Sequence, residues 1–177
     1  MLKPAIEQVL AFLRVLFMQK KQVIFDLMIF ESIDELSREE KVLMNSAVLA
    51  RKDAYSPYSN FQVGAAIFLE NGEIITGNNQ ENASYPSGLC AERVAIFYAG
   101  AKYPGVAIEA IAISATSIDH VVDTPAAPCG NCRQAISEYE FKQKKHISIL
   151  MMGEKGEVHK CNSIGDILPL AFNSSFL

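Results

Sequence analysis

Two closely spaced cysteines are the first sign of chemistry in the sequence. Cys129 and Cys132 follow Pro128 and lie where the residue pattern predicts the first turn of a helix. An i, i+3 spacing places both sulfurs on one side of that turn. The partial positive charge of a helix N-terminus favours the thiolate form that zinc binds. Alone, this C-x-x-C pattern is compatible with a zinc site, a redox pair or neither.

A third cysteine and a glutamate stand ahead of a second predicted helix. Cys90 follows a loop rich in Pro, Ser and Gly, and Glu92 comes two residues later. If both helices direct their N-termini at one ion, Cys90, Cys129 and Cys132 would hold zinc and leave its fourth tetrahedral position open for water, the pattern of a catalytic site. Glu92 would then carry protons beside that water. On its own, Glu92 is better explained as a carboxylate favoured by the helix dipole.

The fourth cysteine, Cys161, leaves a structural alternative open, because four Cys ligands would make a closed structural zinc site. The histidines, His120, His146 and His159, show no ligand spacing with any of these residues. We expect them to be ordinary surface or strand residues.

Composition limits the class of protein. The chain has 177 residues, 50% hydrophobic and 20% charged, as expected of one globular domain. Its formal net charge of −4 argues against a nucleic-acid groove, which relies on clustered Lys and Arg. In a chain with this core composition, C-x-x-C favours metal or redox chemistry over a disulfide framework. We therefore expect a reducing compartment, the cytoplasm.

The first twenty residues need a separate interpretation. Apolar residues at 2, 6, 9, 13 and 16 have helical spacing, which predicts an amphipathic helix packed on the surface. Glu7, Gln8 and Arg14 interrupt the apolar run, so we expect neither a membrane span nor a signal peptide. An alternative is that Met18 is the natural start, which an intact mass of the native protein would test.

The elements that must position the site follow from periodicity and turn signals. Ser37 and Glu40 form a capping box that opens a helix running to about Asp53. Asn71-Gly72 predicts the turn of a hairpin over 61–77. Further helices are expected over 89–99, ended by Gly100, and over 132–141, with strands over 23–30, 106–115, 146–153 and 156–161. This order predicts an α/β fold with a sheet of about five strands, covered by helices, in which the later strands run parallel.

Together these motifs resemble a known family. C-A-E at 90–92 and P-C-G-N-C at 128–132 match the all-cysteine version of the zinc deaminase signature. With SPYSNFQVGAA, NNQENASYPSGLCAER and ILPLAF, they make the chain similar to the small homotetrameric cytidine deaminases of the cytidine/deoxycytidylate deaminase superfamily, from about residue 36 to 172.

This resemblance has implications for fold and activity. It implies a three-layer α-β-α catalytic domain with a central mixed sheet over 36–177, after an N-terminal extension over 1–35. It also implies zinc-dependent hydrolytic deamination of cytidine and deoxycytidine in pyrimidine salvage, with one zinc per subunit and no nucleic-acid or membrane partner.

The resemblance also assigns roles to single residues. Glu92 is implied to be the catalytic acid and base. Substrate contacts are implied for Phe61, Asn79, Glu81, Ala91, Tyr85 and Phe172, the last two reaching a neighbouring subunit's ligand. An aromatic face can stack a flat base, and an amide with a carboxylate can pair with a sugar hydroxyl. Without the resemblance, Phe61 is explained as a core residue and Asn79 as a turn residue, while Tyr85 and Phe172 would be buried in their own subunit.

Two arginines lie next to the cysteines in sequence. Three thiolates give zinc a formal net charge of −1, which would weaken it as a Lewis acid. We expect Arg93, three residues after Cys90, and Arg133 to hydrogen-bond the sulfurs and restore that acidity. The alternative for both is a surface salt bridge.

Other functions remain as alternatives at this point. One is a deaminase of a related aminopyrimidine such as blasticidin S, against which the Asn79–Glu81 pair argues. A second is a nucleic-acid-editing deaminase, and the acidic charge balance argues against it. A third is a non-catalytic zinc module, which would have no use for Glu92.

Overall fold

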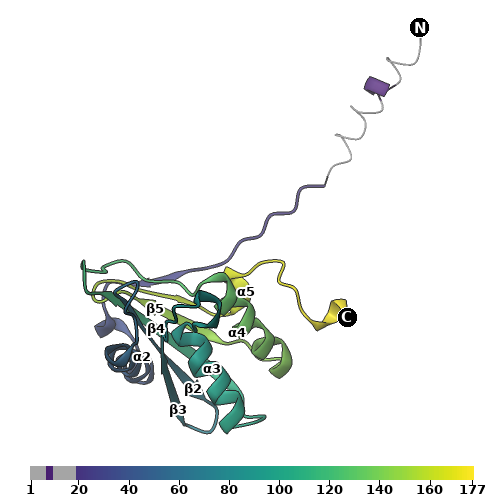
Figure 1. Cartoon of the computed structure of the whole chain (residues 1–177). Coiled ribbons are helices and arrows are strands. Elements are labelled where there is room, and N and C mark those ends of the chain that lie inside the picture. Colours follow the sequence, from purple (N-terminus) through teal and green to yellow (C-terminus); the bar gives the residue numbers. More distant parts are fainter. Residues whose placement is uncertain (1–6, 10–18) are drawn as a thin grey trace.

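The computed structural model of the chain describes residues 7–9 and 19–177 (Figure 1). The amphipathic helix expected over the first twenty residues falls largely outside these described residues, although residues 7–9 are helical. None of the helices in the described part combines the length and apolar character that a membrane crossing requires.

In the described part of the chain, six strands form one mixed sheet in the order β1-β6-β5-β4-β2-β3, close to the expected five. The strands are β1 (Met28–Phe30), β2 (Phe61–Leu69), β3 (Ile74–Asn78), β4 (Ile108–Ser117), β5 (Ser148–Met152) and β6 (Val158–Cys161). The prediction of parallel later strands is correct for β4 and β5. It is wrong for β6, which follows β5 through a short turn and therefore pairs with it antiparallel.

The first strand is shorter than its sequence suggests. Residues 23–30 are mostly apolar and rich in strand-favouring side chains, yet only Met28–Phe30 form β1, paired with Val158–Lys160 of β6. Met28 pairs with Lys160 and β6 ends at Cys161, so residues 23–26 run beyond the partner strand, and residues 23–27 lie exposed. Strand propensity alone does not make a strand where no neighbour offers hydrogen bonds.

Helix α2 (Arg38–Ala50) covers one face of the sheet. Ser37 and Glu40 form the expected capping box, and a 3-10 turn over Arg51–Asp53 follows the helix. The buried residues Leu43, Met44 and Ala47 pack on alternate residues of β2, β4 and β5.

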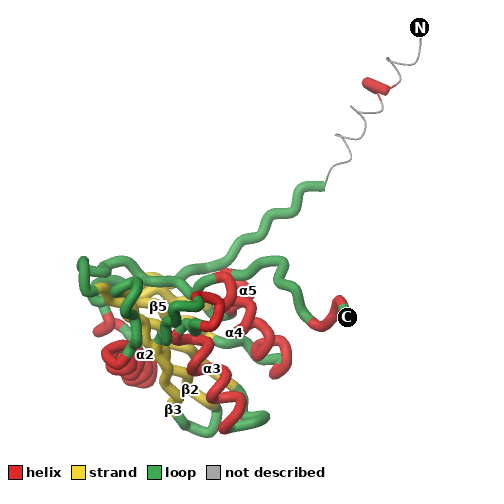
Figure 2. Tube along the Cα trace, in the orientation of Figure 1, coloured by secondary structure: helices red, strands yellow, loops and turns green. Residues whose placement is uncertain are grey.

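Helices α3 (Ala91–Lys102) and α4 (Gly130–Gln143) cover the opposite face, as Figure 2 shows, and the short α5 (Ile164–Ile167) packs beside α4. This arrangement is the expected α-β-α layering. The prediction that Gly100 ends its helix is wrong, because α3 continues to Lys102. Gly100 is instead a close-contact position, since a Cβ there would clash with the Tyr139 hydroxyl of α4.

Candidate active site

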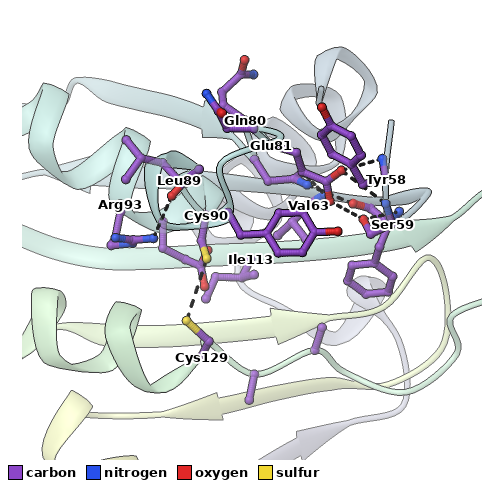
Figure 3. A pocket seen from close by; sticks show the side chains of 18 residues that line it. Tyr58, Ser59, Val63, Gln80, Glu81, Leu89, Cys90, Arg93, Ile113 and Cys129 are labelled. Atoms are coloured by element: carbon purple, nitrogen blue, oxygen red, sulfur yellow. Dashed lines mark hydrogen bonds between the residues drawn. The ribbon is translucent and has the colours of Figure 1, made fainter. Parts of the chain in front are cut away.

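Two helix N-termini bring the three predicted cysteines together. Cys90 is the N-cap residue of α3, and Cys129 is the N-cap residue of α4. Cys132 lies in the first turn of α4 and is fully buried. The Sγ atoms of Cys90 and Cys129 are 3.8 Å apart, and those of Cys129 and Cys132 are 3.5 Å apart. Figure 3 shows Cys90 and Cys129 facing each other across the two helices.

The spacing of these sulfurs fits a zinc ion. All three Sγ atoms lie within 4.8 Å of one another. A tetrahedral ion with Zn–S bonds of about 2.3 Å separates its sulfurs by about 3.8 Å, close to both measured distances. Three thiols with no fourth Cys, His, Asp or Glu in the group make a donor set suited to zinc with one position free.

Charge around the cluster favours a thiolate at Cys90. The neighbouring Cys132 thiol lowers the pKa of Cys90 to about 5, with help from Cys129 and Arg93 and against the effect of burial. Cys90, burial and the Glu92 charge together raise the pKa of Cys132. Both cysteines also lie at helix N-termini, where the macrodipole stabilises negative charge.

The fourth cysteine lies elsewhere. Cys161 ends β6 and is buried in the hydrophobic core between the sheet and α3–α4. Burial raises the pKa of Cys161 to about 11, so it is held as a thiol. A closed four-cysteine site is therefore not what the described structure contains.

Glu92 lies in the first turn of α3, two residues after Cys90. It is only 4% exposed, although it lines the cavity described next. Burial raises the pKa of Glu92, and the negative charge of Cys90 adds to that rise. The helix therefore presents a carboxyl that is easily protonated directly beside the thiol cluster.

A cavity of about 640 Å³ opens in front of the cluster (Figure 3). The residues predicted for the site that line it are Phe61, Asn79, Glu81, Tyr85, Cys90, Glu92, Arg93 and Cys129. They come from the start of β2, the segment between β3 and α3, and the starts of α3 and α4. Residues separated by up to 68 positions in sequence thus meet in one pocket of a size suited to a small ligand.

Two of these polar side chains are already hydrogen-bonded to the protein. The Asn79 amide accepts from the Val63 N–H at 2.8 Å and donates to the Phe61 carbonyl at 3.0 Å. The Glu81 carboxylate accepts from the Ser59 hydroxyl and from the backbone N–H groups of Tyr58 and Ser59. The hydrogen bond from the Ser59 hydroxyl lowers the pKa of Glu81. Slight burial acts in the opposite direction, and the hydrogen bonds from the two backbone N–H groups lower the pKa further. Both side chains therefore have fixed orientations at the cavity wall.

Besides the fully buried Cys132, three predicted site residues lie outside the cavity lining. Ala91 is fully buried at the start of α3. Phe172 is 58% exposed on the C-terminal segment, where its ring stacks on Phe176 with centroids 5.6 Å apart. Arg133 donates to the carbonyls of Pro128 and Ile167, both at 2.8 Å, and so braces the approach to Cys129.

The sequence reasoning missed part of the wall. Tyr58 and Ser59 line the cavity, and Tyr58 makes an edge-to-face contact with Tyr85 at 6.1 Å between centroids. Ile113 of β4 and the pair Ala126–Ala127 also line it. Tyr58 and Ser59 belong to the SPYSNF stretch, so their loop position next to Phe61 was a usable signal. Ile113 and the two alanines carry no such signal, because their side chains are ordinary apolar ones.

This combination of fold and site defines a class of zinc-dependent hydrolytic enzymes in which a carboxyl group acts beside an open metal position. The family model for the cytidine and deoxycytidylate deaminase zinc-binding region matches residues 37–147. A cytidine deaminase of Halalkalibacterium halodurans is 38% identical over 140 residues, covering 77% of this chain and 96% of that protein. Another, from Sporosarcina psychrophila, is 37% identical over 139 residues, covering 78% of this chain and 93% of that protein.

A solved structure gives the same result. The crystal structure of cytidine deaminase from Burkholderia pseudomallei is 40% identical, with a TM-score of 0.65, and the match covers 77% of this chain and 100% of that one. The chain therefore belongs to the cytidine and deoxycytidylate deaminase family.

Proposed function

We propose that the chain hydrolyses cytidine and deoxycytidine to uridine and deoxyuridine with release of ammonia. The observation that carries this proposal is a buried glutamate, Glu92, beside three clustered thiols at the base of a ligand-sized cavity. Relatives that are named cytidine deaminase and match over nearly their whole length support it.

The cysteines and Glu92 have distinct parts in the reaction. Cys90, Cys129 and Cys132 would hold zinc, which when bound would supply a Lewis acid that makes water nucleophilic at neutral pH. Glu92 takes a proton from the attacking water and delivers it to N3 of the base as C4 is attacked. Its carboxylate then takes the remaining proton from the new hydroxyl group on C4 and delivers it to the amino group, which leaves as ammonia while the C4 carbonyl forms. A carboxyl whose pKa is raised by burial can both accept and give a proton near neutral pH.

Phe61, Asn79 and Glu81 hold the nucleoside in this proposal. The Phe61 ring stacks on the base. Asn79 has one N–H and one lone pair beyond its bonds to β2, and the Glu81 carboxylate retains acceptor capacity beyond its three loop donors. Both therefore have groups left for a ribose hydroxyl. Ala91 contributes through its backbone, because its methyl group is fully buried.

Arg93 is proposed to moderate the charge of the thiolates. Its guanidinium is close enough to lower the pKa of Cys90, and it donates to the Gly88 carbonyl at 3.3 Å. Its buried Nε has no hydrogen-bond partner among the described residues. For Arg133 the same role has less support, since its donors bond the Pro128 and Ile167 carbonyls.

We further propose a homotetramer in which Tyr85 and Phe172 complete the pocket of a neighbour. Tyr85 is 75% exposed and Phe172 is 58% exposed. Aromatic side chains that are this exposed in a single subunit are suited to burial in an interface with another subunit. Phe97, Tyr98 and Phe141 are exposed on the outer surfaces of α3 and α4 and suit the same interface.

The proposal also covers the domain boundary, the cellular compartment and the substrate class. Residues 36–177 form the catalytic domain and residues 1–35 an extension, which the family match beginning at residue 37 supports. The four free thiols suit a reducing cytoplasm, and the acidic net charge of −4 suits a small-molecule rather than a nucleic-acid substrate. The reaction would serve pyrimidine salvage.

Product analysis tests the function. Zinc-loaded protein is incubated with cytidine, deoxycytidine, blasticidin S or a cytosine-containing oligonucleotide, and ammonia and the deaminated product are measured together. We expect uridine or deoxyuridine and ammonia in equal amounts from the two nucleosides. Absence of ammonia from both nucleosides, with zinc bound, would contradict the proposal, and turnover of blasticidin S alone would replace it.

A further inference from the structure

A buried arginine lies on the opposite side of the sheet from the cavity. Arg51 is the first residue of the 3-10 turn after α2 and is 9% exposed. Its Nη1 donates to the Ser114 hydroxyl at 2.6 Å, the Gly153 carbonyl at 3.2 Å and the Ala115 carbonyl at 3.3 Å. Ser114 also donates to the Gly153 carbonyl at 3.0 Å. One guanidinium thus ties the end of α2 to two strands.

These contacts lie at the point where the two parallel strands separate. The last paired residues of β4 and β5 are Ser114 and Met152, and Gly153 follows immediately. Beyond this rung β4 leads into the loop 118–128, and β5 leads into the turn that begins β6. Ligand sites in sheets of this kind are built by the loops at the carboxyl ends of parallel strands.

Gly153 and Glu154 in turn support the loop 118–128. The Glu154 N–H donates to the Val122 carbonyl at 2.6 Å, and a Cβ on Gly153 would clash with that same carbonyl. The Thr116 hydroxyl donates to the Glu154 carboxylate at 3.0 Å. The loop continues into Ala126 and Ala127, which line the cavity, and then reaches Cys129.

Arg51 is a buried charged side chain without a carboxylate in direct contact, which is unusual for a residue that only packs in a core. Among the described residues no carboxylate lies within 4.0 Å of its guanidinium, so its direct partners are neutral acceptors, and the Glu154 charge acts on it only from farther away. Burying a charge in this way costs free energy that an apolar side chain of similar volume would not. Its donors can, however, bridge three acceptors on two strands, which an apolar side chain cannot do.

We propose that Arg51 is a positioning residue for the deaminase site: through Gly153 and Glu154 it fixes the loop 118–128, and with it the Ala126–Ala127 wall of the cavity. Its effect on turnover rests on the proposed function. Its effect on the loop does not.

The test compares Arg51→Met and Arg51→Lys with Lys52→Met, a control at the next, exposed residue. Hydrogen exchange is followed in peptides covering 118–128, the Glu154 amide, α3 and α4, together with zinc content. In Arg51→Met we expect at least about tenfold faster exchange at 118–128 and Glu154, with α3 and α4 unchanged and zinc retained. Arg51→Lys should lie between Arg51→Met and wild type, because it keeps the charge but fewer donors.

Kinetics with cytidine provide the second measurement. Misplacing a substrate-contacting wall by about 1 Å can cost about 10²-fold. We expect Arg51→Met to lower kcat/KM by about 10- to 100-fold, with most of the change in KM, while Lys52→Met leaves both constants unchanged. An arginine with a merely structural role would lower the melting temperature and leave the KM of the folded protein unaltered.

Two outcomes would overturn the proposal. One is unchanged exchange at 118–128 in Arg51→Met. The other is an increase spread evenly over α3 and α4, which would show global destabilisation instead. If Arg51→Met does not fold, Ser114→Ala removes the hydroxyl between Arg51 and Gly153 and must show the same localised effect on a smaller scale. Failure of the wild type to deaminate cytidine would contradict the proposed function, and the exchange data would still decide the role of Arg51.

Discussion

Cys90 and Cys129 occupy the same position on two different helices: each is the N-cap residue, and their Sγ atoms are 3.8 Å apart. Neither side chain makes a capping hydrogen bond to its own helix. Both thiols are therefore available to a common ligand, while two helix macrodipoles favour their ionised form. The pairing of helix ends brings the thiols together, and farther along the two helices α3 packs closely on α4 where Gly100 meets Tyr139.

Replacing one thiol of the cluster should remove zinc. We expect Cys129→Ser to lose stoichiometric zinc and all measurable deamination, because a neutral hydroxyl is a poor zinc ligand compared with a thiolate. Metal content by mass spectrometry and ammonia release are the measurements. Cys161→Ala is the matched control, since this cysteine lies in the core away from the cluster. Loss of zinc from the control, with folding intact, would mean that the ligand set is wrong.

Subunit mixing tests whether pockets are shared. We expect Phe172→Ala and Glu92→Gln each to be nearly inactive alone, and co-expressed subunits to regain activity. In a mixed tetramer, a pocket with an intact Glu92 can receive Phe172 from its neighbour. Doubly tagged assemblies are purified and assayed, with sedimentation to give the oligomeric state. Full activity of Phe172→Ala, or mixed assemblies no more active than their parents, would refute sharing.

The amino-acid sequence predicts the site cysteines, Glu92 and the layered fold better than it predicts individual tertiary contacts. The cysteines and Glu92 could be placed because reactive side chains with fixed spacing carry their chemistry with them. The layered fold followed from periodicity and from signals such as the Ser37–Glu40 box. By contrast, whether residues 23–26 join the sheet depends on the length of β6, and the role of Gly100 depends on Tyr139 of another helix. Both features depend on residues distant in sequence, which local patterns do not reveal. The same is true of Arg51, whose hydrogen-bond partners Ser114 and Gly153 lie far away along the chain.

An ion pair between α2 and β6 should make stability depend on pH. Lys160 Nζ lies 2.6 Å from the Glu40 carboxylate, which also completes the capping box. Partial burial opposes the charged form, but hydrogen bonds from Lys160 and Ser37 outweigh it and lower the pKa of Glu40 below its ordinary 4.5. This stability is present above pH 4.5 and is lost as the pH falls through the lowered value.

Glu40→Gln isolates that charge, because glutamine can keep the capping box. We expect it to reduce the free energy of unfolding by about 1–3 kcal/mol at pH 7, with the deficit shrinking toward pH 3. The exposed Glu39→Gln is the control in the same helical turn. Denaturant unfolding across this pH range is the measurement, and a deficit that stays constant down to pH 3 would contradict the assignment.

Two truncations test how much of the proposed N-terminal extension contributes to stability. Removing residues 1–27 takes away no residue of the two cores in the described structure, so we expect stability within about 0.5 kcal/mol of wild type and unchanged kcat/KM. Removing residues 1–35 also takes β1 and the packed side chains Phe30 and Ile33. We expect a loss of more than about 2 kcal/mol, measured by denaturant unfolding. Equal stability of the two truncated chains would show that β1 adds nothing.

The central claim is that Glu92 carries the protons of a zinc-dependent deamination, and its most direct test is Glu92→Gln. Glutamine keeps the shape and the helix but cannot exchange protons. We expect one zinc per chain, unchanged folding and a loss of at least about 10²–10⁴ in kcat for cytidine, measured by ammonia release against wild type. Retained zinc with kcat within tenfold of wild type would contradict the account.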